Sequence, residues 1–178
     1  GLLTRRRGVG TIVSPRHVHR PMELTSLMRD LVNAGHKVHT TIQHYEARPA
    51  TAQEADTLKI TEGTLVVHIE RTRFADNEPI AVLTNLIPAD IAPTMQELES
   101  ASLYDLMRER GVTLASARQI IGARSATTKE AKLLSEHRGA ALLTSQRTTY
   151  DPSGRIVECG NHIYRASRYS FEASLFAQ

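Results

Sequence analysis

The sequence TAQEADTLKITEG at residues 51–63 returns 76 positions later as TTKEAKLLSEHRG at residues 127–139. The matching positions are those that begin a helix, face a core or shape a turn: Thr51 with Thr127, Glu54 with Glu130, Leu58 with Leu134 and Gly63 with Gly139. The same offset relates the flanking segments: Ser26-Leu27, Leu31, Gly35 and Val38 with Ser102-Leu103, Met107, Gly111 and Leu114, and Arg71, Phe74 and Ile80 with Arg147, Tyr150 and Ile156. One offset that serves caps, turns and core positions predicts a duplicated unit without a gap.

Each unit predicts the same series of elements. A helix begins near Ser26 or Ser102 and ends at Gly35 or Gly111, where glycine can take the left-handed conformation. An extended run, a short helix opened by a Thr-x-x-Glu capping box and a hairpin follow. The extended runs are His36–Arg48 and Val112–Ala126, and the hairpins are Leu65–Ala75 with Ile80–Ile87 and Ala141–Tyr150 with Arg155–Arg165. Two such units predict an α+β fold, a mostly antiparallel sheet with flanking helices and pseudo-twofold symmetry.

The composition suits a compact domain. The chain has 178 residues, of which 40% are hydrophobic and 23% charged, enough to bury a sizeable core. It shows neither an apolar run of membrane-spanning length nor an apolar signal core, so we expect a cytoplasmic protein. The single cysteine, Cys159, allows no internal disulfide and no cysteine-based zinc site.

The charge is concentrated near the start of the chain. Residues 1–20 contain five arginines and no acid, whereas the whole chain carries +3, so the other 158 residues carry 3 − 5 = −2. Any attraction to a polyanion therefore belongs to the first segment. Aromatic residues make up 4% of the chain and tryptophan is absent, which argues against a stacking platform for single-stranded nucleic acid.

The first thirteen residues predict a β-hairpin with arginines at its tip, although a frayed basic tail is the alternative. The run Leu2–Val13 resembles the wing that closes the winged helix-turn-helix domain of GntR-family transcription regulators. The resemblance implies a wing remnant at 1–14, a linker at 15–22 and a recognition helix upstream of this chain. It also implies DNA contacts from Arg5, Arg6, Arg7, Gly8 and Gly10. The pair His17-x-His19 lacks a carboxylate, so we expect it to be solvated and expect no metal site.

Two arginines predict an anion site in the body of the chain. Strand alternation places Leu65, Val67, Ile69, Arg71 and Arg73 on one face, which its apolar members mark as the inner one. A buried guanidinium needs an anionic or strongly accepting partner. Arg147 is the repeat counterpart of Arg71, whereas Thr149 replaces Arg73. The halves are therefore chemically unequal.

The two serines at helix starts, and Glu158 on the last long strand, each have two alternative roles. Ser26 and Ser102 stand at helix starts, either as simple caps or as ligand donors. The last long strand carries Glu158 on one face with Ile156, His162 and Tyr164. Glu158 either serves a ligand or pairs with an arginine.

Residues 23–178 resemble the effector-sensing UTRA domain of HutC-type GntR regulators, which shares its fold with chorismate lyase. The motifs that carry the resemblance are Leu24-Thr25-Ser26, Arg71-Thr72-Arg73 with Asp76–Ile80, Ser102-Leu103-Tyr104, and Ile156-Val157-Glu158 with Tyr164–Phe171. The resemblance implies a pocket lined by Arg71, Arg73, Ser102, Tyr104, Glu158 and Tyr164, with Ser26 beside them. Two departures are Leu83, where many members have a glutamate that contacts a sugar-like effector, and Ser167, where an aspartate is common.

We therefore expect a non-enzymatic sensor domain without a cofactor. Its effector would be a sugar phosphate, an amino sugar or a small carboxylate, with the amino sugar disfavoured by Leu83. The resemblance further implies a homodimeric repressor that binds operator DNA and no membrane. The alternatives are a chorismate lyase-like enzyme acting on a small carboxylate and a dimerisation module without a ligand. The enzyme lacks support because no nucleophile and base share a strand face: Cys159 points away from the face of Glu158.

Overall fold

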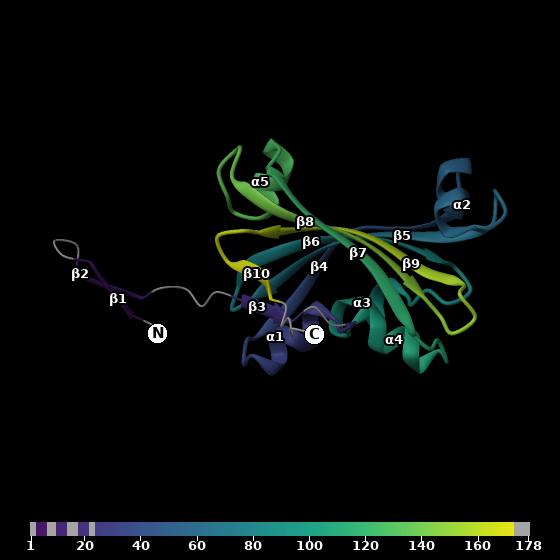
Figure 1. Ribbon diagram of the computed structural model, residues 1–178, viewed down its shortest axis with the longest axis horizontal. Helices are drawn as coiled ribbons and strands as arrows, with labels where there is room; N and C mark the ends of the chain where they lie inside the picture. Colours follow the sequence, from purple (N-terminus) through teal and green to yellow (C-terminus); the bar gives the residue numbers. More distant parts are fainter. Residues whose placement is uncertain (1–2, 7–9, 14–17, 22–23, 173–178) are drawn as a thin grey trace, which may run out of the picture.

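A computed structural model of the chain describes the backbone of residues 3–6, 10–13 and 18–21, and residues 24–172 with their side chains (Figure 1). The helices are α1 (Leu27–Asn33), α2 (Ala52–Leu58), α3 (Met95–Ser100), α4 (Leu103–Glu109) and α5 (Thr128–Leu133). The strands are β1 (Leu3–Arg6), β2 (Gly10–Val13), β3 (Val18–Pro21), β4 (Val38–Pro49), β5 (Leu65–Ala75), β6 (Glu78–Pro88), β7 (Ser116–Ser125), β8 (Ala141–Tyr150), β9 (Ile156–Arg165) and β10 (Tyr169–Glu172).

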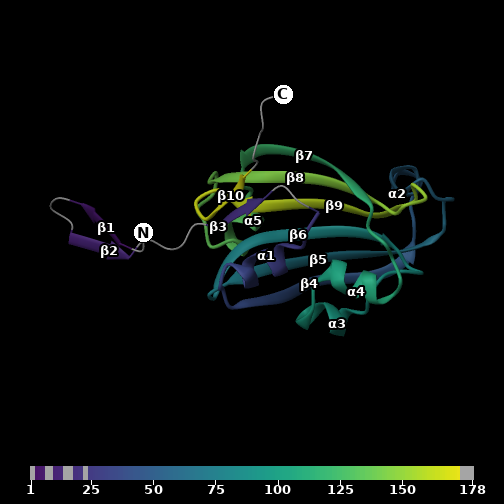
Figure 2. The ribbon, with the colours of Figure 1, turned by 60° about the horizontal axis from the view of Figure 1, so that its bottom comes forward.

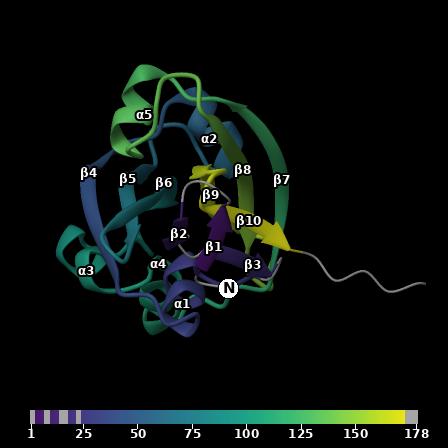
Figure 3. The same ribbon diagram turned by 90° about the vertical axis from the view of Figure 1, so that its left-hand side faces the viewer.

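A six-stranded antiparallel sheet organises the body, in the order β4-β5-β6-β9-β8-β7. Figures 1 and 2 show α1, α3 and α4 on one face of the sheet and α2 and α5 on the other. The sheet curves strongly, so that β4 and β7 form its two outer edges in the end-on view of Figure 3. The α+β fold predicted from the sequence is confirmed.

The two units are related by a pseudo-twofold axis, but the prediction of a gapless repeat was wrong. Arg71 pairs with Leu83, whereas its counterpart Arg147 pairs with Gly160, which lies 77 rather than 76 positions beyond Leu83. The cause is the second hairpin turn, Pro152-Ser153-Gly154, which is one residue longer than Asp76-Asn77. Ile80 therefore corresponds to Val157 and not to Ile156.

The centre of the sheet carries this symmetry. Strands β6 and β9 pair there, with Thr84 opposite Asn161, and these two residues are themselves 77 positions apart. Each is therefore the counterpart of the other, and the axis passes between them. The two halves meet along one strand pair, so the sheet is continuous across the repeat.

The helix boundaries follow the predicted caps. Thr51 with Glu54 and Thr127 with Glu130 form complete capping boxes at the starts of α2 and α5. Gly35, with φ 83°, follows the end of α1, and Gly111, with φ 81°, follows α4. Helix α3, with its own capping box of Thr94 and Glu97, was not predicted.

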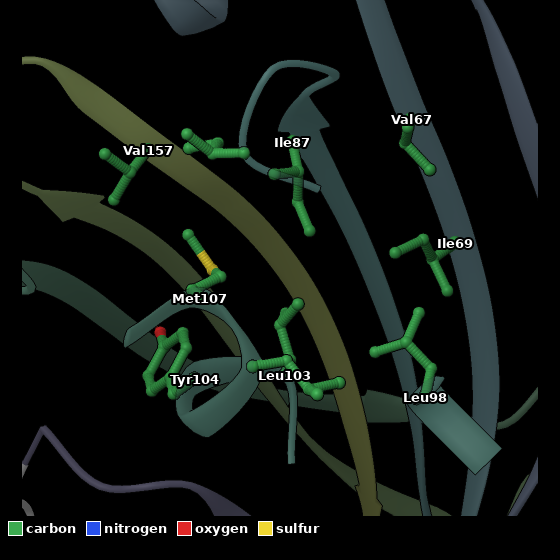
Figure 4. Close-up of a cluster of buried hydrophobic side chains, with 10 residues drawn as sticks. Val67, Ile69, Ile87, Leu98, Leu103, Tyr104, Met107 and Val157 are labelled. Carbon is green, nitrogen blue, oxygen red and sulfur yellow. The ribbon is translucent and has the colours of Figure 1, made fainter. Parts of the chain in front are cut away.

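A hydrophobic cluster packs α3 and α4 against the sheet (Figure 4). Its fully buried members Ile69, Ile87, Leu98 and Met107 are 0% exposed, and each such side chain contributes about 1.5–3 kcal/mol. Tyr104 belongs to the same cluster, so its ring is held while its hydroxyl group faces polar residues. The cluster thus fixes α4 relative to the pocket described below.

Strand β5 is more buried than its alternation predicted. Val66 and Thr72, expected on an outer face, are 0% and 1% exposed, whereas Leu65 is 58% exposed. The reason for Val66 is a second cluster beneath α2, which covers that face. The expectation of a single inner face was therefore wrong, although Arg71 and Arg73 are buried as predicted.

The N-terminal segments form two further strand pairs. Strands β1 and β2 make the predicted hairpin, with Leu3 opposite Val13. Arg7, Gly8 and His17 lie outside the described residues, and of Arg5, Arg6, Gly10 and His19 only the backbone is described. Strand β3, within the predicted linker, pairs in parallel with β10. Within the described ranges, no helix has the length and apolar character needed to cross a membrane.

Candidate functional site

The predicted pocket residues gather on the sheet face that carries α1 and α4. Strand β5 supplies Arg71 and Arg73, the starts of the two helices supply Ser26 and Ser102, and β9 supplies Tyr164. They surround a cavity of about 40 Å³, little more than the volume of one water molecule. The full lining is Thr25, Ser26, Leu27, Met28, Arg71, Arg73, Leu83, Asn85, Ser102, Leu103, Tyr104, Arg147, His162 and Tyr164.

Arg71 and Arg73 are buried and poorly satisfied. Each is 2% exposed. Arg71 donates from Nη2 to the carboxamide oxygen of Asn85 at 2.7 Å, and Arg73 donates from Nη1 to the hydroxyl group of Thr40 at 2.5 Å. The Nε and Nη1 atoms of Arg71 and the Nε atom of Arg73 have no hydrogen-bond partner within the described part of the chain.

Burial makes these positive charges costly. Desolvation lowers the pKa of Arg71 to about 10, against a partial opposing effect from Glu158. It lowers the pKa of Arg73 to about 9, with repulsion from Arg71 adding to the effect. A buried cation is costly unless it is paired, so two neighbouring guanidinium groups without a bound carboxylate indicate a place for an anion.

The two helix-start serines have different roles. The Oγ atom of Ser26 accepts the backbone N–H of Arg29 at 3.1 Å, so Ser26 caps α1. The Ser102 side chain makes no cap hydrogen bond. Its Oγ is buried without a partner among the described residues. Ser102 is therefore the serine available to a ligand.

Glu158 was predicted to line the pocket, but it is not among the residues that line the cavity and is held through neutral hydrogen-bond donors. It is 0% exposed and accepts hydrogen bonds from Asn85 at 2.6 Å, Thr149 at 2.8 Å and Tyr104 at 3.2 Å. Burial raises the pKa of the Glu158 carboxyl group, although its hydrogen bonds oppose the rise. The ion pairs of the described region do not include Glu158, so the alternative of direct pairing with an arginine was wrong.

Arg147 is the third guanidinium group of the pocket. It donates from Nε and Nη2 to the Gln119 carboxamide oxygen at 2.9 and 2.7 Å, and from Nη1 to the Tyr104 hydroxyl group at 3.4 Å. Burial, followed by the nearby Glu158 carboxylate, raises the pKa of Tyr104 to about 12. Three arginines thus face one carboxylate, and the pocket carries an excess of positive charge.

Sequence reasoning missed the residues that hold the charged groups in place. Asn85, Thr40 and Gln119 contact the three arginines, and none was among the predicted site residues. Asn85 had a signal, because it and Thr84 are the only polar residues of the otherwise apolar run Ile80–Ile87. Thr40 and Gln119 lie on edge strands, where polar residues are ordinary.

Gly160 leaves room for two polar side chains to meet. A Cβ atom added at Gly160 would lie 2.5 Å from Oε1 of Glu158 and 2.6 Å from Nε2 of His162. Both side chains therefore occupy the space above this glycine. Next to them, the ring of Tyr164 stacks on Tyr169 at a centroid distance of 4.3 Å and walls the cavity.

The second departure from the family pattern affects an outer network. Ser167 donates to Oε1 of Glu136 at 2.6 Å, and Arg165 donates from Nε to the same oxygen at 3.0 Å. Arg165 also pairs with Glu78 at 3.1 Å. Ser167 thus supports an ion-pair network at the end of β9 and is not among the residues that line the cavity.

A larger cavity, of about 500 Å³, lies on the opposite face of the sheet, beside α5. Its charged residues include Glu130 paired with Arg124 and Glu70 paired with Lys129. Those charges satisfy one another and leave no excess. The smaller cavity, where buried arginine nitrogens have no hydrogen-bond partner among the described residues, is therefore the candidate site.

Comparison with known proteins now identifies the family. The UTRA domain model matches residues 33–170. This chain belongs to the UTRA family. The resemblance inferred from the motifs is confirmed, and the chain is the effector-sensing part of a GntR-type transcription regulator of the HutC branch.

Curated relatives of this UTRA domain are named regulators. The transcriptional repressor NagR of Bacillus subtilis is 31% identical over 174 residues, 96% of this chain and 72% of NagR. The probable transcriptional regulator PhnF of Escherichia coli is 33% identical over 140 residues, 75% of this chain and 57% of PhnF. The chain thus spans only part of each relative.

Solved structures share the fold of this UTRA domain. PhnF from Mycobacterium smegmatis superposes with a TM-score of 0.88 at 24% identity, covering 99% of this chain and 79% of that one. A putative transcriptional regulator from Streptomyces coelicolor has a TM-score of 0.72 at 48% identity, covering 80% of this chain and 96% of that one.

Proposed function

We propose that this UTRA domain senses a small metabolite that carries a phosphate or carboxylate group. The observation that most strongly supports this proposal is the burial of Arg71 and Arg73. Each residue is 2% exposed, and each has guanidinium nitrogens without hydrogen-bond partners in the described part of the chain. An anionic group between them supplies the missing acceptors and offsets the buried charge.

The other residues of the pocket suit a ligand in which the anionic group is attached to a polyhydroxylated skeleton. The buried hydroxyl group of Ser102, which has no hydrogen-bond partner among the described residues, lies in the lining beside the arginines, and Glu158 is hydrogen-bonded to the lining residues Asn85 and Tyr104. Leu83, which is 5% exposed, lines the cavity where many family members have a glutamate. We therefore favour a sugar phosphate or a small carboxylate over an amino sugar.

Ligand entry requires the pocket to open. A cavity of about 40 Å³ has no room for a sugar phosphate. Four of the lining residues, 25–28, lie at the start of α1, which contacts β3 and follows it in the chain. An effector that moves α1 would favour one arrangement of the segment that leads toward the N-terminal hairpin. Coupling between effector binding and DNA binding requires such a preference for one arrangement.

The regulator as a whole is proposed to be a cytoplasmic homodimeric repressor. Its winged domain would bind operator DNA, with Arg5, Arg6, Arg7, Gly8 and Gly10 in the wing. Support comes from the backbone hairpin of β1 and β2. NagR, which is named a transcriptional repressor, also supports this role. The absence of an enzymatic role is part of the proposal, and the burial of Cys159, whose pKa rises to about 11 through desolvation, supports it.

A thermal-shift comparison tests the sensor role. Glucose and glucose 6-phosphate differ only in the anion, and a ligand at ~100 times its dissociation constant adds roughly 2.7 kcal/mol to stability. We expect sugar phosphates or small carboxylates to stabilise the chain, and their neutral parents to have no effect. Arg71→Met should abolish the shift, while Arg138→Met, at an exposed arginine, should retain it. A neutral parent that stabilises as well as its phosphate ester would overturn the proposal, as would turnover of the bound compound.

A further inference from the structure

The described residues that line the candidate cavity include three arginines and no acid. Arg71 and Arg73 are each 2% exposed, and Arg147 is 5% exposed. A phosphate monoester carries roughly two negative charges at neutral pH, so a phosphate group alone offsets two of the three arginine charges. Because a buried cation is costly unless it is paired, the lining favours a ligand with a further negative charge.

Arg147 lies apart from the arginine pair of β5. It stands on β8, and β6 and β9 lie between these two strands (Figure 2). Neighbouring strands are about 4.8 Å apart, so β5 and β8 are roughly 14 Å apart along the sheet. The guanidinium groups also point in different directions, because Arg71 donates to Asn85 on β6 and Arg147 donates to Gln119 on the edge strand β7. A phosphate group held by Arg71 and Arg73 therefore leaves Arg147 to another part of the ligand.

The hydrogen bonds of Arg147 within the described part of the chain go to neutral groups. Its Nε and Nη2 atoms share the carboxamide oxygen of Gln119 at 2.9 and 2.7 Å. Its Nη1 atom lies 3.4 Å from the hydroxyl oxygen of Tyr104, beyond the usual range of about 2.7–3.2 Å. The ring of Tyr104 is fixed in the hydrophobic cluster of α4 (Figure 4). The Nη1 side of Arg147 is thus the side that a stronger acceptor would satisfy.

We propose that the effector carries a carboxylate group in addition to its phosphate group, and that Arg147 binds this carboxylate. The inference rests on the proposed function and narrows its ligand class to a phosphorylated hydroxy acid. The phosphate group would lie between Arg71 and Arg73, and the carboxylate would accept a hydrogen bond from Nη1 of Arg147. Charge-assisted bonds of this kind are stronger than bonds to neutral acceptors. The two anionic groups together carry roughly three negative charges, which match the three arginines of the lining.

Calorimetric titration with two matched ligands tests the second anionic group. The probes are 6-phosphogluconate and sorbitol 6-phosphate, which share a linear hydroxylated carbon chain and a terminal phosphate group. They differ at the other end, where the first has a carboxylate and the second has a hydroxymethyl group. We expect the parent chain to bind 6-phosphogluconate ~10-fold or more tightly, because a hydrogen bond to a charged group is worth at least this factor.

Two substitutions test whether Arg147 is the source of that preference. Arg147→Met removes the charge, and Gln119→Glu pairs it with an isosteric carboxylate while leaving the arginine in place. Either change should bring the two dissociation constants to within ~2-fold of each other. Arg138→Met, at an exposed arginine, is the matched control and should keep the full preference. Arg71→Met should weaken the binding of both ligands.

The outcomes separate this inference from the proposed function. Equal binding of the two ligands by the parent chain would overturn the role of Arg147, as would a preference that survives both Arg147→Met and Gln119→Glu. Equal binding that Arg71→Met abolishes would overturn the second anionic group and uphold the anion site. Binding of neither ligand would also overturn the inference, and saturable sulfate binding that Arg71→Met abolishes would then uphold the anion site alone.

Discussion

Arg71, which lines the pocket, is joined to the buried Glu158 through Asn85. The guanidinium group donates to the carboxamide oxygen of Asn85 at 2.7 Å, and the carboxamide nitrogen donates to Glu158 at 2.6 Å. The Asn85 carboxamide separates the two charged groups and forms one hydrogen bond with each of them. The remaining side of Arg71 stays available to a ligand, which a direct ion pair would have prevented.

Removing a buried charge should stabilise the chain without effector and remove its anion response. For Arg73→Met we expect the free energy of unfolding to rise, by about 1–4 kcal/mol if the gain matches that found when buried ion pairs are replaced by packed apolar groups. Thermal unfolding with and without a sugar phosphate measures both effects. A variant that melts lower than the parent chain and still responds to the ligand would contradict this account of Arg73.

Anion binding should weaken as the pH rises through the titration of Glu158. Burial raises the pKa of this carboxyl group, so at low pH it is neutral and the pocket carries one more net positive charge. Sulfate does not titrate in this range and is a suitable probe. We expect its dissociation constant to rise with pH in the parent chain and to stay nearly flat in Glu158→Gln.

The same group affects stability in a defined direction. Because the folded chain holds the Glu158 proton more tightly than the unfolded chain, the free energy of unfolding should fall as the pH rises from the ordinary carboxyl value through the raised pKa. Glu158→Gln should lose this contribution. Identical pH profiles for the two chains would show that Glu158 has no raised pKa.

Gly160 should be essential to the pocket. In Gly160→Ala the new methyl group would lie 2.5 Å from Glu158 and 2.6 Å from His162, so at least one side chain must move. We expect ~10-fold or greater loss of effector affinity, since 1.4 kcal/mol corresponds to a factor of ten. Calorimetric titration measures it, and wild-type affinity in Gly160→Ala would show that the positions of these side chains do not matter.

The capping boxes should limit acid stability. Arg48 contacts Glu54 and lowers the pKa of its carboxyl group to about 2, and Arg124 does the same for Glu130. Their contribution is present above the ordinary carboxyl pKa and is lost as the pH falls from about 4.5 toward about 2. Glu54→Gln and Glu130→Gln should each lose at most about 1 kcal/mol at neutral pH and show a shallower acid transition in denaturant titrations.

Local signals predicted much of this fold. The Thr-x-x-Glu patterns, the helix-ending Gly35 and Gly111, and the strand alternation around Arg71 each reflect interactions within a few residues. The one-residue shift between the repeats was not foreseen, because the sequence from Asp151 to Arg155 does not show how many residues the turn takes. Helix α3 was also missed, although its Thr94 and Glu97 carry the capping signal.

The candidate site was predictable in its charged members but not in its connections. Arg71, Arg73, Ser102, Tyr104 and Tyr164 do line one cavity, and Glu158 hydrogen bonds to two residues that line it. Which serine caps its helix, and which neutral groups bind each arginine, depends on contacts between strands far apart in the chain. A single sequence does not contain that information.

Calorimetric titration of sulfate into the parent chain, Arg71→Met and Arg138→Met tests the central claim most directly, because it isolates the anion from the rest of the effector. We predict saturable binding at one site per chain in the parent and in Arg138→Met, and its loss in Arg71→Met. Equal binding by all three chains, or no binding by the parent, would contradict an anion site at Arg71 and Arg73.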